Sequence, residues 1–133
     1  MTDTSWVQQF LTIPFASGGR DYNGADCWGL TRLALIHLTG KELPSYADAY
    51  ENALDSEQTS HVIVNGALAI ATPVDHPQIG DVCVMKTYGR ICHVALYIGN
   101  DRILHTDSDT GPCTPRIDDI MIKGRIVRWY HVN

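Results

Sequence analysis

The sequence predicts an α+β domain in which helices come first along the chain and an antiparallel β-meander follows. Two observations predict this order. Apolar residues recur with helical spacing up to residue 39, and alternating, β-branched segments begin after Gly80. The chain has 133 residues, enough for a single hydrophobic core and too few for two, so residues 1–133 are expected to form one domain.

The N-terminal half carries the helical signals. A short amphipathic helix is predicted at about residues 4–13, where Pro14 ends the pattern. A glycine-containing loop follows, and Asp26 then occupies the N-cap position of a second helix that begins at Cys27. This helix is predicted to end near residue 39, with Gly40 as its C′ residue. Apolar side chains cover nearly its whole circumference, which is typical of a buried, central helix.

The remaining elements follow from weaker or alternating patterns. A further helix is predicted at about residues 56–70, and the prolines after it end that pattern. Strands are predicted at 81–86, 91–98, 102–106 and 124–131, with turns at 88–90 and 99–101.

Composition excludes several classes of function. Ten basic and fifteen acidic residues give a net charge of −5, and the basic residues are scattered, so we expect no nucleic-acid binding. The apolar runs are too short to span a bilayer, so we expect no membrane insertion. The N-terminal residues lack the pattern of a secretory signal peptide, which predicts synthesis in the cytoplasm.

The four cysteines lie at positions 27, 83, 92 and 113, and no pair has metal-ribbon or thioredoxin-like spacing. We therefore expect free thiols. Most free cysteines are small buried hydrophobes, but Cys27 stands at the start of a helix, where unpaired N–H groups and the helix dipole favour a thiolate. Cys27 is the candidate nucleophile, Cys83 has the pattern of a core residue, and no role is assigned to Cys113.

A nucleophilic thiol needs a base, and that base needs an orienting partner. Among six histidines, His93 and His105 lie in strands that the turn at 99–101 folds together. With a three-residue loop, His105 lies opposite Ala95, and the two imidazoles are diagonal neighbours on one face, about 7–8 Å apart at Cα. A two-residue loop would place them on opposite faces, so a histidine pair requires the odd loop or a bulge near Gly99.

Four segments together resemble the NlpC/P60 family. Residues 14–19 and 24–30 resemble its P-Y-x-x-G-G loop and its D-C-S-G-L helix start. Residues 79–82 resemble the P-G-D strand start, residues 93–99 resemble H-V-G-I-Y-x-G, and residues 103–105 resemble the following strand with its third catalytic residue. The match runs in family order over roughly residues 6–107.

The resemblance implies a papain-like fold, with the nucleophile helix packed on an antiparallel sheet. It also implies a cysteine endopeptidase of peptidoglycan stem peptides that cuts next to D-γ-glutamyl and diaminopimelate residues. In this reading Cys27 is the nucleophile, His93 the general base and His105 the orienting residue. No cofactor and no metal are implied.

The same resemblance places Phe15, Asp26 and Trp28 where substrate binds. Phe15 stands in place of the usual tyrosine and Trp28 in place of the usual serine, which removes two polar groups from that region. The D-C-W-G-L sequence is similar to compact members encoded by tailed phages and prophages. This subgroup implies phage tail proteins as partners and a location in the virion or a phage-like particle.

Other classes of function remain open at this stage. The same three residues suit an amidase, acyltransferase or thioesterase that acts on another acyl group. Phe15 and Trp28 are compatible with a non-catalytic tail-assembly or interaction module of the same fold. A zinc site formed by Cys27, His93, His105 and Asp107 is the least favoured alternative.

Overall fold

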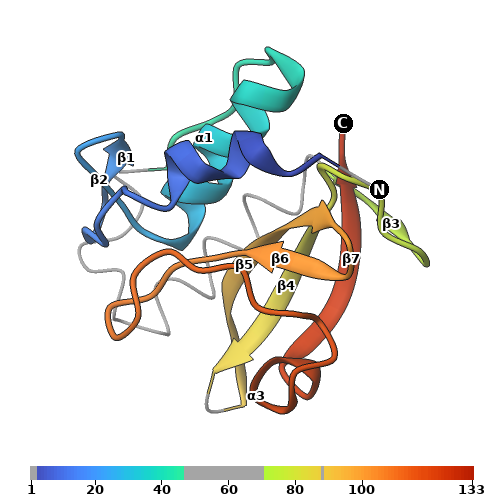
Figure 1. The fold of residues 1–133 in the computed structure, drawn as a ribbon. Coiled ribbons are helices and arrows are strands. Elements are labelled where there is room, and N and C mark those ends of the chain that lie inside the picture. The colour runs from blue at the N-terminus through green and yellow to red at the C-terminus, as the bar shows by residue number, and fades with distance from the viewer. Residues whose placement is uncertain (1–2, 47–70, 88) are drawn as a thin grey trace.

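A computed structural model describes residues 3–46, 71–87 and 89–133 of the chain. Helix α1 and the short helix η1 lie together on one face of a twisted antiparallel sheet (Figure 1), which confirms the predicted α+β class. The elements in chain order are η1 (Ser5–Phe10), β1 (Arg20–Asp21), β2 (Gly24–Ala25), α1 (Cys27–Thr39), β3 (Ala71–Val74), β4 (Val82–Thr87), β5 (Arg90–Gly99), β6 (Arg102–Leu104), α3 (Ile120–Lys123) and β7 (Ile126–Val132).

The main sheet has five strands in the order β3-β7-β4-β5-β6, and all neighbours are antiparallel. The predicted strands 81–86, 91–98, 102–106 and 124–131 correspond to β4, β5, β6 and β7. Strand β3 was not predicted because it contains Pro73, which cannot donate to a ladder. The strand lies at the edge of the sheet, where a missing donor is tolerated.

Helix α1 follows the sequence prediction residue for residue. Asp26 caps it by accepting a hydrogen bond from the Gly29 backbone N–H at 2.9 Å, and Gly40 ends it in the left-handed conformation with φ 69°. Gly29 is required for a different reason, since a Cβ at this position would overlap the carbonyl oxygen of Gly19. Close approach of the glycine loop therefore fixes the start of α1 against β1.

The core lies between the helices and the sheet. Its largest fully buried side chains on this side are Phe10, Ile13, Leu30, Leu35, Leu96, Ile98 and Leu104. Leu33, Ile36 and Leu38 are only partly buried, so the expectation that α1 is buried all round is wrong for its second half. A second cluster, formed by Cys83, Met85, Ala95, Ile103 and Ile122, covers the opposite face of the sheet.

Other differences from the prediction concern short elements. The predicted α-helix at 4–13 is instead a 3-10 helix, with i→i+3 bonds such as that from the Val7 N–H to the Thr4 carbonyl. Thr4 makes no side-chain cap bond there, and Thr12, Ile13 and Pro14 follow, which disfavour a longer helix. The predicted loop at 14–25 contains the small β1–β2 hairpin, and α3 was not predicted.

The helix predicted at 56–70 lies outside the described residues. Within the part of the chain that the structure describes, no helix is both long enough and apolar enough to cross a membrane.

Candidate active site

The start of α1 is held by the carboxylate of Asp26. This side chain is fully buried and accepts hydrogen bonds from the Gly18 and Gly29 backbone N–H groups, each at 2.9 Å. It also forms an ion pair of 2.8 Å with Arg20, whose side chain is 10% exposed. Cys27 is the next residue, so these bonds fix its position relative to the loop before α1.

Cys27 packs against the sheet in a small cluster with Trp28, Val84 and Val94. Burial raises the pKa of its thiol to about 12, and the negative charge of Asp26 acts in the same direction. A backbone hydrogen bond at Val94 and the charge of Arg20 oppose this rise without cancelling it. The helix start favours a thiolate, but in this state burial outweighs it, and the charge of the capping carboxylate adds to the effect of burial because it offsets the positive end of the helix.

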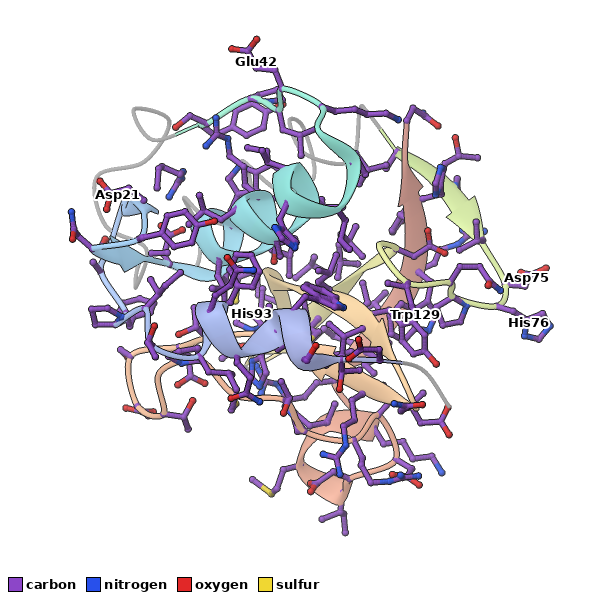
Figure 2. All side chains as sticks on the ribbon, turned by 45° about the horizontal axis from the view of Figure 1, so that its top comes forward. Asp21, Glu42, Asp75, His76, His93 and Trp129 are labelled. Atoms are coloured by element: carbon purple, nitrogen blue, oxygen red, sulfur yellow. The ribbon has the colours of Figure 1, made fainter. Side chains whose placement is uncertain are left out.

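His93 and His105 lie together, as the strand register predicted. Nε2 of His93 is 2.9 Å from Nδ1 of His105, and the two rings are perpendicular with centroids 5.1 Å apart. Both side chains are buried. Figure 2 shows His93 inside the molecule, whereas Glu42 and His76 project from its periphery.

The register that joins these strands depends on a bulge. Leu96 pairs with Leu104 as the three-residue loop predicted, but Gly99 pairs with Arg102 after a shift between Tyr97 and Gly99. The turn itself has two residues, Asn100 and Asp101, which are both in the left-handed conformation. The three-residue loop is therefore wrong, and the alternative of a bulge near Gly99 is confirmed.

The electrostatic setting keeps both imidazoles neutral. Burial lowers the pKa of His93 to about 3, with smaller contributions from His105 and Arg125 in the same direction. Burial also lowers the pKa of His105, although the carboxylate of Asp107 opposes this effect. At neutral pH each ring therefore carries one proton and can both donate and accept.

Cys27 contacts the strand that carries His93, but its thiol forms no hydrogen bond with His93. The thiol lies against Val94, the residue after His93. Among the described residues no hydrogen bond joins this thiol to His93 or His105, and the polar partner of His93 is His105. Cys27 on α1 thus contacts β5 at the residue after His93, and the assignment of Cys27, His93 and His105 as a triad remains a prediction.

The residues predicted to contact substrate differ in accessibility. Asp26 is buried in the contacts described above. Trp28 is 5% exposed, and its indole N–H donates to the Pro44 carbonyl at 3.1 Å, so it anchors the segment after α1. Phe15 is half-buried and its backbone forms a bridge with Ala25. Of the three, Phe15 is the one whose side chain this structure leaves accessible.

Cys113 was assigned no role from the sequence, yet it lies at this site. Its Sγ is 3.3 Å from Nε2 of His105, on the side of that ring opposite His93. All four cysteines are free thiols. Within the described ranges, no group of three or more His, Cys, Asp or Glu side chains has an arrangement that could hold a metal ion.

A cavity of about 200 Å³ lies at the other end of α1. Leu38, Lys41, Gly80 and Val132 are among the residues that line it. It includes neither Cys27 nor either histidine of the pair, so it is separate from the site described here.

The sequence of this chain is similar to a protein family and to a curated protein. The model of the NlpC/P60 family matches residues 12–128. Protein P54 of Enterococcus faecium is 24% identical over 97 residues, which cover 73% of this chain and 16% of that protein. This chain therefore spans about a sixth of the length of that curated relative.

Solved structures share the fold. The NlpC/P60 domain of the peptidoglycan hydrolase SagA has a TM-score of 0.60 at 19% identity and covers 96% of this chain and 92% of its own. An NlpC/P60 family protein from Bacillus cereus has a TM-score of 0.64 at 22% identity, over 90% of this chain and 35% of its own. At these identities the likeness concerns the fold.

These observations define a papain-like α+β domain in which a cysteine begins a helix that packs on an antiparallel sheet. Because the family model covers residues 12–128, the chain belongs to the NlpC/P60 family.

Proposed function

We propose that this chain is a cysteine peptidase that cleaves peptidoglycan stem peptides at a D-γ-glutamyl–diaminopimelate type of bond. Membership of a family whose members are generally cysteine peptidases supports the proposal. The observation that carries it is the 2.9 Å hydrogen bond from His105 to His93, which lies on β5 next to Val94, a residue that packs against Cys27. We interpret this buried pair of imidazoles as a proton-transfer group and not as core side chains that only fill space.

In this proposal Cys27 is the nucleophile, His93 the base and His105 the residue that orients it. Nε2 of His93 bonds to His105, which leaves Nδ1 to accept the proton of the thiol. Catalytic hydrogen bonds are often long before substrate binds and shorten in the complex, so the resting separation of Cys27 and His93 is compatible with these roles.

The protonation states favour general-base catalysis over a preformed ion pair. With a thiol pKa of about 12 and a His93 pKa of about 3, the resting pair is a neutral thiol beside a neutral imidazole. Attack then requires that the proton leave sulfur as the S–C bond forms. The charged pair is created only in the transition state, where nearby dipoles stabilise it.

The chemical steps follow from these roles. Sγ of Cys27 attacks the scissile carbonyl carbon while Nδ1 of His93 takes the thiol proton. Collapse of the tetrahedral intermediate breaks the C–N bond, and His93 returns the proton to the leaving amine. A water molecule, deprotonated by His93, then hydrolyses the thioester and regenerates the thiol. In this mechanism the Cys27 backbone N–H at the helix start forms part of the oxyanion hole.

The test is digestion of purified stem peptides and muropeptides, with products identified by mass spectrometry. We expect the wild type to cleave next to the γ-glutamyl residue and Cys27→Ala to lose at least about a thousandfold in rate. Cys83→Ala is the matched control, because this thiol is buried in the cluster on the opposite face of the sheet from Cys27. Equal cleavage by Cys27→Ala and wild type would reject Cys27 as the nucleophile.

The same digestion separates the alternative functions. Turnover of other amide or thioester substrates, with the same dependence on Cys27, would indicate an amidase, acyltransferase or thioesterase instead of a stem-peptide peptidase. Absence of turnover on every acyl substrate would indicate a non-catalytic module with this fold.

We also propose that the protein is delivered by a phage tail or a related particle. The similarity of Asp26-Cys27-Trp28-Gly29-Leu30 to compact phage-encoded members supports this location. Quantitative mass spectrometry of particles purified after prophage induction should find the chain in the tail fraction. Recovery of the chain only in the cell-wall or cytosolic fraction would reject the proposal.

A further inference from the structure

Cys113 is held beside His105 by the backbone. The two residues form an antiparallel bridge, in which the His105 N–H donates to the Cys113 carbonyl at 3.2 Å and the Cys113 N–H donates to the His105 carbonyl at 2.9 Å. Residues that exchange both backbone hydrogen bonds lie directly opposite one another with side chains on one face. The Sγ–Nε2 distance of 3.3 Å therefore reflects a fixed backbone pairing.

His105 is consequently bonded at both ring nitrogens. Nδ1 lies 2.9 Å from His93, and Nε2 lies 3.3 Å from Cys113. A neutral imidazole carries one N–H and one lone pair, so it donates on one side and accepts on the other. If Cys113 accepts from Nε2 of His105, then His105 accepts from His93; if Cys113 donates to Nε2, then His105 donates to His93.

Thr110 determines how Cys113 bonds. The Thr110 hydroxyl lies 3.0 Å from a carboxylate oxygen of Asp107 and 2.9 Å from the Gly111 carbonyl, and both of these can only accept. Its single proton is used there, so its oxygen is the acceptor in the contact of 3.9 Å with Cys113 Sγ. The S–H of Cys113 then points to Thr110, and its sulfur lone pairs face His105.

We propose that Cys113 is a positioning residue that fixes the tautomer of the histidine pair. Its sulfur accepts the Nε2–H of His105, so Nδ1 of His105 accepts from Nε2–H of His93. Nδ1 of His93 is then left unprotonated and can accept a proton. The opposite arrangement, in which Cys113 donates to His105, would place a proton on Nδ1 of His93 and block its action as a base.

The proposal rests on the proposed function for its consequence in catalysis, but its structural content can be measured separately. Burial raises the pKa of Cys113, the Thr110 hydroxyl lowers it without cancelling this rise, and the charge of Asp107 raises it further, so the group remains a thiol at neutral pH. Cys113 acts through His105 and does not touch the reacting atoms.

The first measurement is the protonation of the imidazole nitrogens by long-range ¹H–¹⁵N NMR. In the wild type we expect His105 to be protonated at Nε2 and His93 at Nε2. Cys113→Ser retains an acceptor that can donate to Thr110 and should keep both tautomers, whereas Cys113→Ala should give a mixture. A wild-type His105 protonated at Nδ1, or unchanged tautomers in Cys113→Ala, would overturn the proposal.

The second measurement is steady-state kinetics on the stem peptide. We expect Cys113→Ala to lower kcat about tenfold, the scale on which supporting hydrogen-bond partners act in metal sites, with little change in KM. Cys113→Ser and the control Cys83→Ala should retain wild-type kcat. Equal kcat in Cys113→Ala and wild type would overturn the catalytic role. If the wild type cleaves nothing, the proposed function fails, while the NMR result still decides the role of Cys113.

Discussion

Nε2 of His93 lies 2.9 Å from Nδ1 of His105, inside a protein interior where both rings are neutral. The bond joins His93 on β5 to His105, which directly follows β6, and it exists because a bulge before Gly99 sets the register of these two strands. In a hydrogen bond between two neutral imidazoles, one ring donates and the other accepts. Which ring donates depends on the groups that bond to the other nitrogen of each ring.

Replacement of His105 tests the direction of this bond. Asn places an amide oxygen near the position of Nδ1 and can still accept from His93, whereas Ala cannot. We expect His105→Ala to lower kcat about a hundredfold and His105→Asn to recover most of that loss. Peptide cleavage rates of the two variants, compared at equal folded fraction by circular dichroism, provide the measurement. Equal rates for both would show that His105 does not act as an acceptor.

The pH dependence of activity tests the neutral thiol–imidazole pair. The acid limit of kcat/KM should follow the His93 pKa of about 3, and the alkaline limit the Cys27 pKa of about 12. Between about pH 5 and 9 we therefore expect a plateau in kcat/KM, with a normal solvent isotope effect because the proton moves during attack. A bell-shaped profile with an acid limb near pH 6–7 would instead indicate a thiolate–imidazolium pair in the resting protein.

Local signals predicted α1 well, because its two ends are encoded by single residues. Asp26 supplies the cap and Gly40 the left-handed stop, and both act within one turn of the helix. Alternation likewise predicted β4 to β7. The sequence offered no comparable signal for Cys113, because its contact with His105 arises when the loop from Asp107 to Gly111 folds back.

The same limit applies to the electrostatics of Cys27. A helix start favours a thiolate when considered alone, but Asp26 must be buried next to Cys27 in order to cap that helix. The depth of burial and the sign of the nearest charge depend on how α1 packs on the sheet. That packing is set by the tertiary structure and not by the residues that flank Cys27 in the sequence.

Folding stability should fall as the pH is lowered from about 6.5. The folded pKa of His93 is about 3, below its ordinary value of 6.5, so the unfolded chain binds a proton that the folded chain excludes. Stability is therefore present above pH 6.5 and is lost toward pH 3, with a slope of up to about 1.4 kcal/mol per pH unit for one group. His105 contributes with the same sign.

Urea unfolding at pH 5 to 7 measures this slope in a range where carboxylates stay ionised in both states. We expect His93→Gln to flatten the slope. Substitution of the exposed His76 by Gln is the matched control and should leave it unchanged. An unchanged slope in His93→Gln would contradict the neutral, buried state of this ring.

Asp26 is expected to be the most costly polar residue to replace. Asp26→Ala removes the acceptor of the Gly18 and Gly29 N–H groups and the carboxylate partner of the largely buried Arg20. Breaking a buried ion pair on one side costs about 3–5 kcal/mol of the free energy of unfolding. Asp119→Ala is the matched control, because Asp119 caps the exposed α3 through the Met121 N–H at 2.8 Å and should cost about 1 kcal/mol.

Asp26→Asn separates the charge from the cap. The amide oxygen can still accept from Gly29, but the negative charge that raises the pKa of Cys27 is gone. We therefore expect a smaller loss of stability than in Asp26→Ala, together with faster alkylation of Cys27 by iodoacetamide at pH 9. Faster alkylation is expected because a lower pKa increases the thiolate fraction. If alkylation of Cys27 is no faster in Asp26→Asn, or if Asp26→Ala costs no more than Asp119→Ala, the carboxylate does not control the helix start as described.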